Sequence, residues 1–176
     1  MAHKRLFSLV LASILAFPLS AFGENRNHSR TDIRQLEGGE IADSATLSVD
    51  ALIASMNRER ITRGLRPLHV NQSLSLAAGD RVRDMLAQHY FSHVSPAGVD
   101  PFTWVDRRGY DYSEIGENLA VGYATADDVV NGWMHSSGHR DNILRSAFAE
   151  VGIAFTDISP TRPFRGPLVV VLYGAR

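Results

Sequence analysis

Three side chains that can bind metal ions or carry protons lie between positions 93 and 139 of the sequence. They are His93 in FSHVSP, Glu117 in IGENLAVG and His139 in HSSGHRDNIL, and each is close to glycine or a turn-forming residue. With His89 and His135, four of the seven histidines fall between positions 89 and 139. Histidine titrates near neutral pH, and a neighbouring carboxylate can select its tautomer. Such a group can bind a divalent cation or transfer protons.

Two helices are predicted before the first of these residues. Apolar residues at three- and four-residue spacing indicate a helix over 48–63, and Gly64 is suited to end it. A second helix should begin with Asn71 as its N-cap and carry an apolar stripe as far as His89. His93 then follows in a turn after the second helix.

Two further helices are predicted around the glutamate. Asp100 followed by Pro101 favours a short third helix that stops at Gly109. Thr125 and Asp128 form a capping box for a fourth helix, which ends in the segment SSG before His139. In the segment GENL between these helices, Glu117 either fixes a tight turn by accepting backbone hydrogen bonds or belongs to a ligand site, and HRDNILR is expected to form one more helical turn.

Strands are predicted only at the end of the chain. Segments 151–157 and 167–174 are rich in β-branched and aromatic residues, and a turn-rich segment joins them as in a hairpin. Helices first and strands last indicate an α+β domain with a small, mainly antiparallel sheet.

The first residues have the pattern of a signal peptide. Lys4 and Arg5 precede an apolar run that is too short to span a bilayer, and small residues follow it up to Gly23. We expect a signal peptide at 1–23, a flexible polar leader at 24–46 and one folded domain at 47–176. The mature protein is then exported, to a periplasm or to the medium, without a transmembrane span.

Composition excludes several classes of function. The chain has no cysteine, so it has neither disulfides nor a thiol nucleophile. Loss of Lys4 and Arg5 with the signal peptide changes the formal charge from −1 to −3, which does not favour nucleic acid as a partner. We expect a monomer whose partner is a small ligand or another protein.

Three motifs in fixed order carry a family resemblance. FSHVSP, GENLAVG and WMHSSGHRDNIL, preceded by NRERITRGLRPL, resemble the CAP superfamily of cysteine-rich secretory proteins, antigen 5 and pathogenesis-related protein 1, also called the SCP domain. The resemblance covers about residues 48–176. Without cysteine and with SSGHRDNIL, the chain looks most like the bacterial exported branch. The resemblance implies a three-layer α-β-α sandwich.

The resemblance also implies a ligand cleft. Many family members have two histidines and two glutamates there, which in some bind zinc or another divalent ion. By motif these positions correspond to His93, Glu117 and His139, while Ser136 stands where the second glutamate is usual. A serine hydroxyl is a poor zinc ligand, so water, His135 or Asp128 would have to complete the set.

Several functions are compatible with this site. His93 and His139 could bind Zn²⁺ or another divalent cation, with Glu117 as a ligand or as a general base for bound water. The leading hypothesis is an exported protein whose cleft binds a divalent cation or a small polar ligand, without assumed enzyme activity. The alternatives are a metal-dependent hydrolase of peptides or envelope material, with Glu117 as the catalytic candidate, and a lipid-binding, sterol-binding or adhesion module.

Other polar and aromatic residues have simpler interpretations. His89 is expected at a helix end outside the site, whereas His135 either faces solvent or serves as a ligand. Ser136 and Ser137 are interpreted as caps of a turn. Core packing is expected for the large apolar side chains Trp104, Val129, Val130, Trp133, Phe148, Phe155 and Tyr173.

Overall fold

The computed structural model describes residues 46–156 and 166–176. The predicted signal peptide and positions 24–45 of the predicted leader lie outside the described residues, as does residue 157 of the predicted strand. Within the described ranges, no helix combines the length and the apolar character needed to cross a membrane.

Side-chain caps start the first four helices where the sequence predicts them. In each case the cap oxygen accepts a hydrogen bond from the backbone N–H three residues later, which satisfies one of the free donors of the first turn. The helices and their caps are α1 (Val49–Ile61) with Ser48, α2 (Gln72–Ala87) with Asn71, α3 (Pro101–Arg107) with Asp100, and α4 (Ala126–Met134) with Thr125.

One sequence interpretation in the middle of the chain is wrong, and another is confirmed. The segment containing GENL is not a turn but the strand β2 (Glu114–Val121), with Glu117 near its centre. The helical turn expected at HRDNILR is present and begins two residues earlier, as the helix α5 (Ser137–Leu144), which contains Gly138 and His139. The sequence alone could not distinguish the glycine of GENL from a turn signal.

The sheet has four strands in the order β1-β3-β4-β2. The hairpin strands β3 (Glu150–Phe155) and β4 (Leu168–Ala175) are antiparallel, and β2 pairs antiparallel with β4 along eight residues. A short strand β1 (His69–Val70), absent from the sequence prediction, pairs parallel with β3. The sheet is therefore mainly antiparallel, and β2 forms one of its edges.

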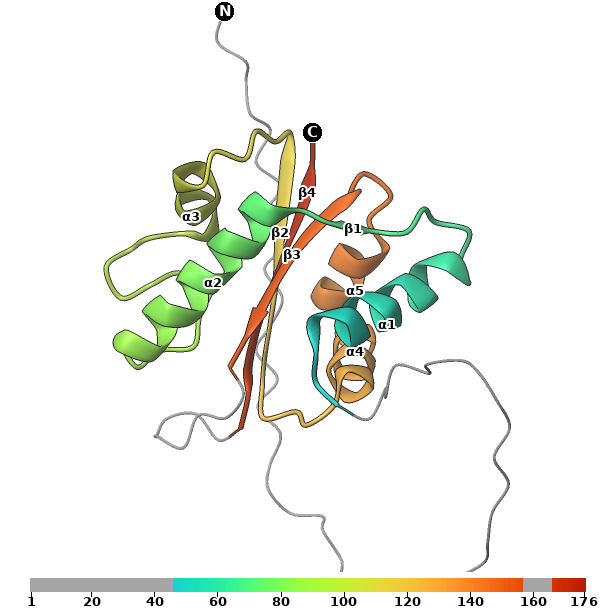
Figure 1. Ribbon diagram of the computed structural model, residues 1–176, viewed down its shortest axis with the longest axis horizontal. Helices are drawn as coiled ribbons and strands as arrows, with labels where there is room; N and C mark the ends of the chain where they lie inside the picture. The colour runs from blue at the N-terminus through green and yellow to red at the C-terminus, as the bar shows by residue number, and fades with distance from the viewer. Residues whose placement is uncertain (1–45, 157–165) are drawn as a thin grey trace, which may run out of the picture.

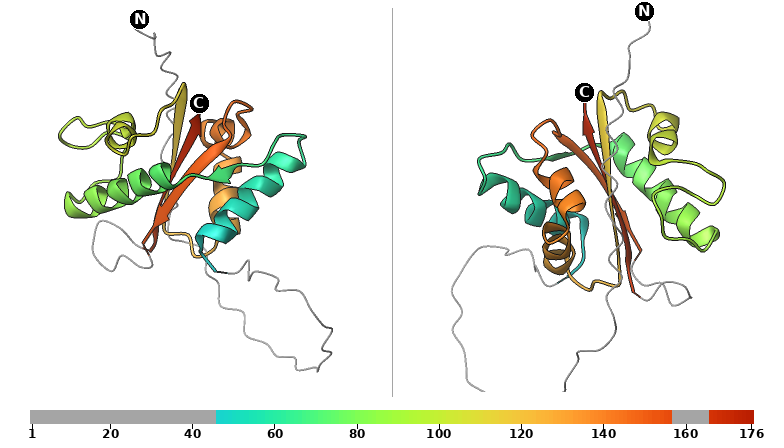
Figure 2. Two further views of the ribbon diagram at one scale, coloured as in Figure 1. Left: turned by 45° about the horizontal axis from the view of Figure 1, so that its top comes forward. Right: turned by 180° about the vertical axis from the view of Figure 1, so that it is seen from behind.

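Helices cover both faces of this sheet. Helices α2 and α3 lie on one face, and α1, α4 and α5 lie on the other (Figures 1 and 2). This confirms the three-layer α-β-α sandwich. Each face has its own apolar core, since the side chains of a strand alternate between the two faces.

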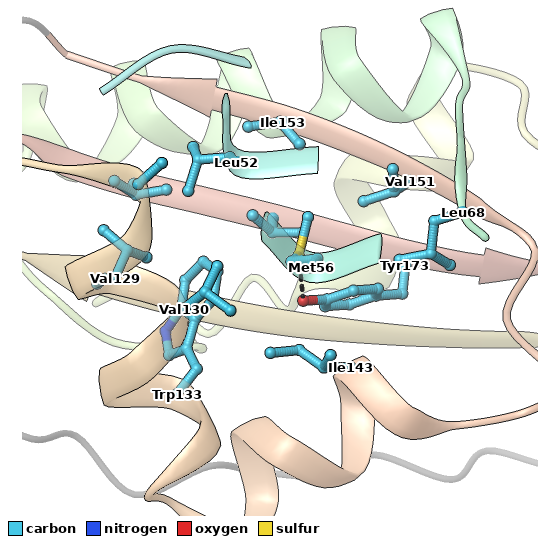
Figure 3. Close-up of a cluster of buried hydrophobic side chains, with 14 of the residues drawn as sticks. Leu52, Met56, Leu68, Val129, Val130, Trp133, Ile143, Val151, Ile153 and Tyr173 are labelled. Atoms are coloured by element: carbon cyan, nitrogen blue, oxygen red, sulfur yellow. Dashed lines mark hydrogen bonds between the residues drawn. The ribbon is translucent and has the colours of Figure 1, made fainter. Parts of the chain in front are cut away.

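The larger core lies between α1, α4, α5 and the sheet. Leu52, Met56, Trp133 and Ile143 pack there around Tyr173 of β4 (Figure 3). The Tyr173 hydroxyl is fully buried and donates a hydrogen bond to Sδ of Met56 at 3.2 Å. Among the residues expected in the core, Trp104 and Phe155 are only half-buried.

A close approach of backbones sets the position of α2. A Cβ atom at Gly152 of β3 would lie 2.0 Å from the carbonyl carbon of Leu74 and 2.3 Å from the nitrogen of Ser75. Only glycine permits this contact between the first turn of α2 and the sheet. The contact matters for the site because α2 carries Arg81.

Candidate functional site

His93 and Glu117 form a buried hydrogen-bonded pair. Nδ1 of His93 lies 2.7 Å from Oε1 of Glu117, and their side chains are 7% and 1% exposed. A carboxylate can only accept hydrogen bonds, so Nδ1 of His93 is the donor. The pair joins the segment after α2 to the centre of β2.

Arg81 of α2 forms a second contact with the same carboxylate. Its Nε donates to Oε2 of Glu117 at 3.0 Å and its Nη2 donates to Oε1 at 3.3 Å. The Arg81 side chain is fully buried. Burial lowers the pKa of Arg81, but the charge and hydrogen bond of Glu117 outweigh that effect, so the pKa is raised above its usual value.

The guanidinium of Arg81 also holds the segment that carries His93. Nη2 donates to the backbone carbonyls of Ser92 and His93, at 2.8 and 3.0 Å. Nη1 donates to the hydroxyl of Tyr90 at 2.8 Å. Arg81 therefore positions both members of the pair, one through its side chain and the other through its backbone.

Successive residues of β2 face opposite layers. Ile115 and Leu119 belong to the core under α2, so Glu117 points to that face as well. Asn118 points to the other face, where its Nδ2 donates to the Tyr173 hydroxyl and to the carbonyl of His139, both at 3.1 Å. Strand β2 thus contacts His93 on one face of the sheet and His139 on the other.

Asn142 attaches α5 to the edge strand. Its Nδ2 donates to the carbonyl of Glu117 at 3.1 Å and to Oδ1 of Asn118 at 2.9 Å. Asn118 is not among the residues predicted for the site, and only the structure shows that these two amides connect Glu117 to His139.

His139 is buried in α5 and is 3% exposed. Its Nδ1 has no hydrogen-bond partner in the described part of the chain. Burial and, to a smaller extent, the nearby His93 lower the pKa of His139 to about 4. The imidazole is therefore neutral at pH 7, and one of its nitrogens is available for a hydrogen bond.

A pocket lies beside His139 at the edge formed by β2. The pocket is partly open to solvent, and its cavity volume is about 10 Å³, room for about one small polar group. The pocket wall combines residues of both layers, namely Phe91, Leu119, Ala120, Tyr123, Gly132, Trp133 and His139. The indole N–H of Trp133 already donates to the carbonyl of Leu119 at 3.0 Å.

His89, His135 and Ser136 lie at helix ends. His135 is exposed at the end of α4, where Nδ1 donates to the carbonyl of Asn131 at 2.8 Å. His89 is exposed after α2. Ser136 occupies the N-cap position of α5, but its side chain makes no capping hydrogen bond. His89 therefore lies at a helix end, as predicted, and of the two alternatives for His135 the structure shows the exposed side chain.

The arrangement does not fit a metal ion held by all three predicted ligands. Within 46–156 and 166–176, no three or more His, Asp or Glu side chains are grouped to hold a metal. Both oxygens of Glu117 accept hydrogen bonds from Arg81, and one also accepts from His93. Zinc binding by His93 and His139 stays a prediction.

Comparison with known proteins agrees with the motifs. The model of the CAP family, the cysteine-rich secretory protein family, matches residues 53–172. The chain belongs to the CAP family. The matched range contains every residue of the pair, the pocket and Arg81, so the candidate site lies entirely in the CAP domain.

Two relatives from Bacillus subtilis (strain 168) are similar in sequence to this chain. The uncharacterized protein YkwD is 38% identical over 118 residues, which are 65% of this chain and 46% of YkwD. The uncharacterized membrane protein YlbC is 31% identical over 108 residues, or 61% of this chain and 31% of YlbC. This chain spans less than half the length of either relative.

Solved structures share the fold. An extracellular protein containing an SCP domain from Bacillus anthracis str. Ames has a TM-score of 0.62 and 23% identity, covering 72% of this chain and 40% of that one. An outer surface protein from Borrelia burgdorferi has a TM-score of 0.61 and 20% identity, covering 72% of this chain and 91% of that one. These similarities support the fold of the CAP domain.

Arg81 is the main residue of the site that sequence reasoning missed. Position 81 lies three residues after Ala78 and four before Met85, on the buried stripe of α2. A charged side chain on such a stripe requires an internal partner, because an unpaired buried charge is costly. This signal was present in the sequence.

Proposed function

We propose that this CAP domain is exported and binds a small, neutral, polar ligand in the pocket beside His139. The observation that carries the proposal is the Nδ1 atom of His139, which is buried and lacks a hydrogen-bond partner among the described residues. Buried polar atoms normally have a partner, so this atom is a candidate contact for a ligand.

The charges around the pocket favour a neutral ligand. His139 is neutral at pH 7 because burial lowers its pKa to about 4. The negative charge of Glu117 is offset by Arg81 at 3.0 Å. An anion would therefore find no net positive charge at His139, and a cation would find no unpaired carboxylate at Glu117.

Export is supported by the signal-peptide pattern at 1–23. A structural neighbour described as an extracellular protein containing an SCP domain is compatible with it. The hydrolase, lipid-binding and adhesion alternatives stay predictions, since no contact in the described residues favours one of them specifically.

Binding can be measured with two probes of the same shape. Acetamide and acetate should be titrated into the mature protein at pH 7 while the side-chain NMR signals of His139 and Trp133 are recorded. We expect acetamide to shift both signals and acetate to leave them unchanged. His139→Phe, which removes the hydrogen-bonding nitrogen, should abolish the shift at Trp133. Unchanged signals with both probes, or equal shifts with both, would contradict the proposal.

A further inference from the structure

We infer that Arg81 is the built-in cation of this site, so that the His93–Glu117 pair is held by a guanidinium in place of a divalent metal ion. This role of Arg81 concerns the carboxylate of Glu117 and not the pocket ligand, so it can be tested independently of the proposed function.

The geometry of the carboxylate is the first argument. Glu117 is 1% exposed and receives donors at both oxygens, from Nε and Nη2 of Arg81 and from Nδ1 of His93. A metal ion bound to the same oxygens would meet the positive guanidinium at about the same place. Two cations cannot share one buried carboxylate without strong repulsion.

The other hydrogen bonds of Arg81 also hold its side chain in this position. Its other donors bind the hydroxyl of Tyr90 and the carbonyls of Ser92 and His93. To free Glu117 for a metal ion, the side chain would have to leave three further acceptors in a buried site. Each lost hydrogen bond would take this donor from an acceptor that is partly buried or, at His93, fully buried.

Arg60 is a second buried arginine, and its contacts differ from those of Arg81. It is as buried as Arg81, but within 46–156 and 166–176 it donates to backbone carbonyls and to no carboxylate, the acceptors being those of Arg66, Ile143, Arg145 and Phe148. Loss of Arg60 should therefore weaken the fold without creating an unpaired negative charge. Arg60→Met is the matched control for Arg81→Met.

The experiment is zinc titration of the mature protein by calorimetry, with denaturation curves recorded in the presence and absence of zinc. We expect wild type and Arg81→Lys to show no zinc binding, because both keep a cation beside Glu117. Arg81→Met should bind one zinc ion at least about tenfold more tightly than the weakest binding that the titration detects, since the unpaired Glu117 beside His93 then attracts a cation. Adding Glu117→Gln to Arg81→Met should remove that gain.

A loss of stability in Arg81→Met does not prevent the test. Zinc should then raise the denaturation midpoint of Arg81→Met, because a ligand that binds only the folded state stabilises it. It should not raise the midpoint of Arg60→Met. The inference is overturned if wild type binds one zinc ion in a manner that His93→Ala abolishes, or if zinc neither binds nor stabilises Arg81→Met.

Discussion

The carboxylate of Glu117 lies 2.7 Å from Nδ1 of His93, although 24 positions separate the two residues in the chain. Neither residue could hold this geometry alone. His93 lies in the segment after α2, and Glu117 lies in β2, so the contact requires α2 to be docked on the sheet. Arg81 crosses the same junction and binds both residues.

Arg81 and Glu117 should depend strongly on each other for stability. Glu117→Gln leaves a buried cation without its partner and should lower the free energy of unfolding by about 3–5 kcal/mol. Arg81→Met should have a similar effect, and the double variant should lose at least about 1 kcal/mol less than the sum of the two. Urea denaturation measures all three values.

A surface ion pair serves as the control for these three variants. Arg58 and Asp127 are 2.6 Å apart, but their side chains are 56% and 47% exposed. Asp127→Asn should therefore cost less than about 1 kcal/mol. Additive effects at Arg81 and Glu117 would show that the buried pair is not coupled.

His139 should make stability depend on pH in the acid range. Its pKa is lowered from 6.5 to about 4 in the folded protein, so between these values the unfolded chain binds a proton that the folded chain does not. Stability should therefore rise by about 3 kcal/mol from pH 4 to pH 6.5 and gain nothing further from His139 above that. His139→Phe should lack this contribution when denaturation is compared across pH. Parallel curves for both proteins would contradict the prediction.

Replacing Gly152 even with alanine should destabilise the protein strongly. The added Cβ would lie 2.0 Å from the backbone of Leu74, so α2 would have to move away from β3. We expect Gly152→Ala to cost more than about 3 kcal/mol, beyond ordinary overpacking. It should also alter the NMR signal of His93, because Arg81 moves with α2.

Gly79 is the control for that substitution. It lies within α2, and a Cβ there would meet only Nη1 of Arg83 at 3.5 Å, an ordinary contact. Gly79→Ala should stabilise the protein by up to about 1 kcal/mol through helix propensity. Equal effects of the two substitutions in thermal denaturation would rule out the backbone contact as the cause.

Replacing His89 with glycine should stabilise the protein. It has a φ of 54°, and the next residue, Tyr90, donates its N–H to the carbonyl of Met85 at 3.1 Å, the pattern of a Schellman helix end. His89→Gly removes a strained left-handed conformation and should stabilise the protein by about 0.5–1 kcal/mol in urea denaturation. Gln88→Gly is the control, because Gln88 has an ordinary φ of −101°. Stabilisation by both variants would point to a cause other than strain.

Local rules predicted the helices well. Ser48, Asn71, Asp100 and Thr125 begin helices because their side chains bind backbone donors only three residues away. Such interactions require no knowledge of the rest of the fold. The strand β2 was missed for the opposite reason, since its hydrogen bonds to β4 join residues more than 45 positions apart.

The sequence by itself determined the family, the main helices, the terminal strands and three residues of interest, His93, Glu117 and His139. Only the tertiary structure decided how these three are used. Alternation along β2 directs Glu117 towards α2, where Arg81 neutralises it, while His139 is buried in α5 beside a pocket. Motifs specify which side chains are present, but charge pairing and burial depend on which elements pack together, and that is settled by contacts between distant parts of the chain.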